Sequence, residues 1–125
     1  LAERVYRERL DNVSVRLGAP ADPKLPERSF DRILMVHMYH EIEAPYEFLW
    51  RMRPSLKDGG QVIIVDADRP TANHGTPPAL LACELAAVGY RQTEARALPQ
   101  PGTYLRAFRT EGTRPDPQNI KVCKG

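Results

Sequence analysis

The stretch SFDRILMVHMYHEI, residues 29–42, carries the features that decide the fold. Residues 30–36 are apolar in their second half on both faces, which is typical of a central strand covered on each side. Two histidines, a tyrosine and a glutamate follow directly. We therefore expect a core strand that leads into a polar cluster at its carboxyl end.

Strand and helix patterns alternate along the rest of the chain. Helices are predicted over residues 1–11, 45–56 and 77–89, and strands over residues 13–17, 30–36, 61–68, 90–96 and 103–110. A turn is predicted at residues 58–60, and the tail, residues 110–125, has no clear pattern. This order predicts an α/β fold: a Rossmann-like, open, mostly parallel sheet with helices on both faces and an antiparallel pair of strands at its C-terminal edge.

Composition narrows the class of protein. The chain has 125 residues, enough for one domain or part of one, and a net charge of +2 with no basic block, so nucleic acid is an unlikely partner. The apolar runs are too short to cross a membrane. Cys83 and Cys123 form neither a disulfide framework nor a zinc pattern, so a reducing cytoplasmic setting is expected. Cys83 is predicted to be a buried small hydrophobe and Cys123 to lie in the tail, open to solvent.

Polar or turn residues follow three predicted strands. Ligands of open α/β sheets bind outside the carboxyl ends of the strands, so these residues are expected to share one rim. The three groups are Gly18, Ala19 and Pro20; then His37, Met38, Tyr39, His40 and Glu41; then Asp66 and Asp68.

Three motifs give these elements a family resemblance. They are Phe30-Asp31 at the start of a strand, LKDGG at residues 56–60 before the next strand, and Gly89-Tyr90 before the final pair. In this order and spacing they resemble the C-terminal part of a class I S-adenosylmethionine-dependent methyltransferase. The resemblance covers residues 12–109, within a partial domain of residues 1–109 that corresponds to strands three to seven of the family. The first two strands, including the glycine-rich cofactor turn, are not recognised. The resemblance therefore implies a piece of a longer protein, inactive by itself.

The resemblance also implies the site residues and the cofactor, S-adenosylmethionine. Cofactor contacts fall on Gly18, Ala19, Pro20, Asp22, His37 and Met38, with Ala19 standing where the family often has an acid. Tyr39, Asp66, Asp68 and His74 are expected to contact the substrate. The Asn/Asp-Pro-Pro-aromatic motif of DNA and protein amide methylases is replaced by His-Met-Tyr-His, so a small-molecule methyl acceptor is expected, with no resident metal.

Histidine is the natural proton acceptor near neutral pH. His40 is the first candidate for a catalytic base, with Glu41 orienting it, and His37 is the second.

Two other functions remain open. One is a metal-dependent hydrolase that uses His37, His40, Glu41, Asp66 and Asp68, which the His-x-x-His spacing at a strand end does not favour. The other is a binding or assembly module without activity. Without the first two strands, residues 13–17 lack a partner and residues 30–36 expose an apolar edge. This predicts either a homodimer through that edge or a non-native pairing of residues 13–17.

Overall fold

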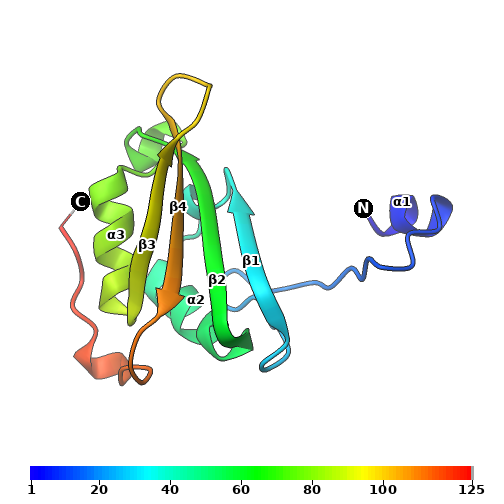
Figure 1. Ribbon diagram of the computed structural model, residues 1–125, viewed down its shortest axis with the longest axis horizontal. Coiled ribbons are helices and arrows are strands. Elements are labelled where there is room, and N and C mark those ends of the chain that lie inside the picture. Colours follow the sequence, from blue (N-terminus) through cyan, green and yellow to red (C-terminus); the bar gives the residue numbers. More distant parts are fainter. Residues whose placement is uncertain (125) are drawn as a thin grey trace.

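The computed structural model describes residues 1–124, and its centre is a four-stranded sheet (Figure 1). The strands are β1 (Phe30–Val36), β2 (Leu56–Ala67), β3 (Tyr90–Ala97) and β4 (Thr103–Thr110), arranged in the order β1-β2-β4-β3. β1 runs parallel to β2, and β4 is antiparallel to both β2 and β3. The predicted open α/β sheet with a C-terminal antiparallel pair is thus confirmed.

Two helices cover one face of this sheet (Figure 1). Both α2 (Pro45–Met52) and α3 (Pro78–Ala87) begin with a proline, whose fixed φ and missing N–H suit the first helical position. Leu49 on α2 and Leu81 on α3 are fully buried, in one core cluster with Val62 and Ile64 of β2. None of the helices in the described residues is long and apolar enough to cross a membrane.

The other face of the sheet is open among residues 1–124. Leu34 and Val36 of β1 are 61% and 57% exposed, and β1 is one of the two edge strands of the described sheet. The predictions of helices on both faces and of a β1 covered on each side therefore differ from the structure. The expected apolar edge is present.

The N-terminal segment stands away from the sheet (Figure 1). α1 (Ala2–Arg7) is shorter than the predicted helix and has no buried residue. The predicted strand over residues 13–17 is wrong, because these residues form no regular structure and Leu17 is 93% exposed. A strand needs a neighbour for its backbone hydrogen bonds, and no other described strand lies beside this segment.

The predicted turn at Asp58-Gly59-Gly60 lies inside β2 as an irregularity. The register passes from Phe30↔Leu56 to Arg32↔Gln61, so β2 carries extra residues opposite β1. A β-carbon on Gly60 would lie 2.9 Å from the Lys57 carbonyl oxygen, which explains why glycine is needed there.

The C-terminal tail is attached to the helical layer. Cys123 forms a disulfide with Cys83 of α3, with a Cα–Cα distance of 6.1 Å. Trp50 Nε1 donates a hydrogen bond to the Pro115 carbonyl at 2.8 Å, and the Arg114 guanidinium lies 3.5 Å from the centre of the Trp50 ring. The prediction of two unpaired cysteines, with Cys83 buried, is therefore wrong: Cys83 lies on an exposed face of its helix, within reach of the tail.

Candidate functional site

The candidate site lies where the parallel strands β1 and β2 end together. Val36 pairs with Val65, and the backbone N–H of His37 donates to the Val65 carbonyl at 2.8 Å. His37 thus leaves the sheet directly beside Asp66. The chain then turns through the short 3₁₀ helix η1 (Tyr39–Glu41), which brings His40 back over the strand ends.

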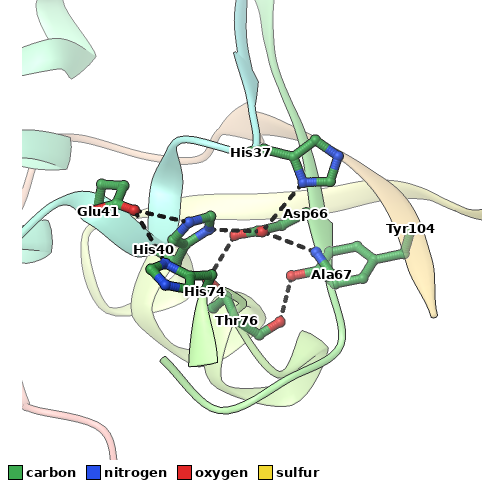
Figure 2. A network of polar contacts seen from close by, with 8 residues as sticks. All are labelled: His37, His40, Glu41, Asp66, Ala67, His74, Thr76 and Tyr104. Atoms are coloured by element: carbon green, nitrogen blue, oxygen red, sulfur yellow. Dashed lines mark hydrogen bonds and ion pairs between the residues drawn. The ribbon is translucent and has the colours of Figure 1, made fainter. Parts of the chain in front are cut away.

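Asp66 is the centre of the polar network in Figure 2. Its side chain is fully buried, and its two oxygens accept three hydrogen bonds. Oδ1 accepts from the Ala67 N–H at 2.9 Å and lies 2.9 Å from His40 Nδ1, and Oδ2 accepts from Thr76 Oγ1 at 2.9 Å. The Tyr104 hydroxyl donates to the Thr76 carbonyl at 2.6 Å, which fixes the threonine in turn. A buried carboxylate with this many partners is held in one orientation.

The His40 ring is oriented by that carboxylate. Its side chain is only 7% exposed. When Nδ1–H donates to Asp66, the neutral ring has its lone pair on Nε2. Nε2 lies 3.2 Å from Glu41 Oε1, and the same oxygen lies 3.6 Å from His74 Nδ1 (Figure 2). Four of the predicted site residues, His40, Glu41, Asp66 and His74, are therefore in one network.

Two histidines of the site have left-handed backbone conformations. His37 has φ 50° and His74, which follows the 3₁₀ helix η3 (Thr71–Asn73), has φ 59°. Residues other than glycine rarely adopt this conformation, although histidine is among those that do so most often, and such residues cluster at functional sites. His37 is the more peripheral of the two candidate bases, since its Nδ1 is 3.9 Å from Asp66 and its side chain is half exposed.

A pocket of about 530 Å³ opens beside His40, between the turn after β1 and α3. Its lining includes Tyr39, Tyr46, Thr76 and Glu84. Tyr39 is buried, and its hydroxyl donates to Glu84 Oε1 at 3.0 Å. Burial raises the pKa of the Glu84 carboxyl, and hydrogen bonds from the Tyr39 and Tyr46 hydroxyls counter that rise.

Thr76 and Glu84 were not predicted as site residues. The sequence does contain a signal that could have identified Glu84, because it is the one charged residue in the apolar helical stretch PPALLACELAAVG. Thr76 had none, since only the folded chain brings its hydroxyl to Asp66.

Other predicted site residues lie apart from the network. Asp68 is exposed, and its backbone N–H donates to the Gly102 carbonyl in the loop between β3 and β4. Gly18, Ala19, Pro20 and Asp22 form a turn closed by backbone hydrogen bonds between Ala19 and Asp22.

That turn contacts helix α2. Asp22 lies 3.8 Å from Arg51, near the end of α2, where the chain is about to enter β2. Among the described residues, no hydrogen bond or ion pair joins this turn to His37, and its role in cofactor binding stays a prediction.

The residues at the end of β1 are open to solvent, and their role in cofactor binding stays a prediction. His37 and Met38 are exposed beside the open face of the sheet, so their ring and thioether are accessible to a ligand.

An open sheet with order β1-β2-β4-β3 and a polar site at the ends of its two parallel strands is Rossmann-like. The family model described as "Methyltransferase domain" matches residues 1–64, just over half of the chain. The chain belongs to this family, whose class I members use S-adenosylmethionine as their cofactor.

Solved structures agree on the fold. A SAM-dependent methyltransferase from Aquifex aeolicus has a TM-score of 0.71 and 22% identity over 85% of this chain and 58% of its own. A putative type 11 methyltransferase from Sulfolobus solfataricus has a TM-score of 0.67 and 19% identity, over 92% and 68% respectively. The mitomycin 7-O-methyltransferase MmcR has a TM-score of 0.70 and 16% identity, over 87% and 38%. This chain thus spans little more than half of the Aquifex protein. A search of curated proteins found no match.

Proposed function

We propose that this chain contributes the acceptor side of a methyltransferase that acts on an oxygen or nitrogen of a small molecule, with His40 as the proton acceptor. The observation that carries the proposal is the His40–Asp66 contact of 2.9 Å beside a pocket of about 530 Å³. S-adenosylmethionine, when bound, supplies a methyl group on a positively charged sulfur. A pocket of this size takes a small acceptor rather than a folded macromolecule.

The roles of the chain's own residues follow from their contacts. Asp66 accepts the Nδ1–H of His40 and so directs Nε2 away from the sheet. Nε2 would take the proton that the acceptor oxygen or nitrogen loses when it receives the methyl group and S-adenosylhomocysteine is released. Glu41, 3.2 Å from Nε2, stabilises the imidazolium formed. His37 and Met38 contact the cofactor, and the loop that carries His74 borders the acceptor.

The alternative of a metal-dependent hydrolase with five ligands gains no support from this arrangement. Asp68, one of those five, is exposed and outside the network, and Asp66 is fully buried with three partners.

We also propose that the chain associates with itself through β1. Leu34 and Val36 lie there on an unpaired sheet edge.

We propose the cytoplasm as the compartment. The Cys83–Cys123 disulfide is the observation that opposes this proposal, since cytosolic thiols are normally kept reduced.

The experiment is made on the full-length protein, with S-adenosylhomocysteine titrated by calorimetry and methyl transfer measured over a set of small phenols, hydroxy acids and amines. His40→Ala is expected to lower kcat by about 10²-fold or more, the contribution of a positioned base, while the affinity for S-adenosylhomocysteine stays the same. A His40→Ala variant that transfers methyl groups at the wild-type rate would refute the base role. Wild-type protein that binds no S-adenosylhomocysteine would refute the enzyme.

A further inference from the structure

We propose that His40 Nε2, the Glu41 carboxylate and His74 Nδ1 form a binding site for a divalent transition metal ion of the zinc type. Among the described residues, His40, Glu41 and His74 each offer one ligand atom, and these atoms lie within 4.8 Å of one another. The inference goes beyond the proposed function, because metal binding at these atoms does not require methyl transfer.

The two distances from Glu41 to the histidines suit such an ion. A metal 2.0–2.1 Å from each of two tetrahedral ligands separates them by about 3.3 Å. His40 Nε2 and Glu41 Oε1 are 3.2 Å apart, and Glu41 Oε1 and His74 Nδ1 are 3.6 Å apart. Two histidines and one glutamate are also a known ligand set for zinc with a fourth position left open.

The site has the outer partner that metal-binding histidines usually have. A ligating imidazole commonly donates its other N–H to a carboxylate, which fixes the ring and raises its basicity. Asp66 is the carboxylate that lies beside His40 Nδ1. It also accepts hydrogen bonds from Thr76 and from the Ala67 N–H (Figure 2).

His40 Nε2 and Glu41 can both offer electron pairs to one cation. In the tautomer set by Asp66, a neutral His40 directs a lone pair at a carboxylate oxygen 3.2 Å away, so two electron-rich atoms face each other. Glu41 pairs only with His40 and His74 in the described chain, and no lysine or arginine pairs with it there.

The two uses of His40 exclude each other. A metal ion bound at Nε2 occupies the lone pair that the proposed base needs, so a bound ion would switch off proton transfer by His40. This consequence rests on the proposed function, whereas binding of the ion does not.

The test is a calorimetric titration of the oxidised full-length protein with Zn²⁺ in a buffer that does not bind metals. Cys83 and Cys123 are then in their disulfide and cannot act as ligands. The chain has three histidines, of which His37 lies outside the proposed site and serves as a matched control. Asparagine replaces histidine in the variants, because His37 and His74 have positive φ values that asparagine tolerates.

We expect one Zn²⁺ per chain in the wild type and in His37→Asn. The affinity for Zn²⁺ should fall by about tenfold or more in Glu41→Gln and in His74→Asn. Loss of a ligand should cost at least as much affinity as loss of a residue that only orients a ligand. Both altered residues are exposed, so the variants keep their fold. In NMR spectra Zn²⁺ should shift the imidazole signals of His40 and His74 and leave that of His37 in place. No saturable binding by the wild type, or an equal loss in His37→Asn and His74→Asn, would overturn the proposal.

Discussion

His40 Nδ1 lies 2.9 Å from Asp66 Oδ1, although the two residues belong to different strand ends and are 26 positions apart in the chain. Parallel pairing of β1 and β2 produces this contact, because it brings the carboxyl ends of both strands to the same edge. The polar network therefore depends on the fold and also stabilises it.

Replacing Asp66 should accordingly destabilise the protein. Asp66→Ala leaves three buried donors without an acceptor, each at a cost of about 1–3 kcal/mol, so we expect a loss of about 3–5 kcal/mol in the free energy of unfolding. Asp66→Asn retains one carbonyl oxygen and should lose less than half as much. Urea unfolding of both variants measures the difference. Equal losses would show that the hydrogen bonds to Asp66 contribute little to stability.

Glu84 should make stability depend on pH. Burial raises the pKa of its carboxyl, so the folded chain holds this proton more tightly than the unfolded chain does. Stability from this group is therefore fully present below the ordinary carboxyl pKa and decreases as the pH rises from there through the raised value.

Variants of Glu84 and of its partner Tyr39 isolate the contribution of Glu84 to the pH dependence of stability. Glu84→Gln should remove the part of the stability decrease that comes from Glu84. Tyr39→Phe should extend the decrease in stability to higher pH, because the Tyr39 hydroxyl donates to the Glu84 carboxylate and lowers its pKa. Urea unfolding at a series of pH values compares both with the wild type. An unchanged pH dependence in Glu84→Gln would contradict this assignment.

The sequence predicts much of this site through local patterns. Apolar runs followed by polar residues mark the ends of β1 and β2, so the amino-acid order alone is enough to point to His40, Glu41 and Asp66. The other contacts of the site depend on how the elements pack in the folded chain. Sequence patterns do not show that Thr76 meets Asp66 or that Tyr39 points into the core toward Glu84. Likewise, the alternating residues 13–17 have the pattern of a strand but form none, because a strand also requires a neighbour.

The disulfide was not predictable for a similar reason. Two cysteines 40 residues apart give no spacing motif, and their proximity depends on how the tail follows the helical layer. We expect reduction of Cys83–Cys123 to lower the free energy of unfolding by about 2–4 kcal/mol. The double variant Cys83→Ser, Cys123→Ser should show the same loss and no response to reductant.

Trp50 fluorescence should report whether the tail leaves the helical layer when the disulfide is reduced. Trp50 is the single tryptophan of the chain, and it contacts Pro115 and Arg114 of the tail. Release of the tail should shift its fluorescence to longer wavelength as water reaches the ring. Unchanged fluorescence on reduction would mean that these contacts hold the tail without the disulfide.

The edge strand β1 should control self-association. Leu34 and Val36 are the large apolar side chains exposed on it, and an unpaired apolar edge favours contact with another chain. Leu34→Arg with Val36→Arg should therefore convert a dimer to a monomer in analytical ultracentrifugation, because burying two charges without partners costs several kcal/mol. Leu17→Arg is the matched control, since Leu17 is equally apolar and 93% exposed but lies outside the sheet. A wild-type protein that is monomeric at every concentration would refute the interface, and a Leu17→Arg variant that also dissociates the dimer would move it to the N-terminal segment.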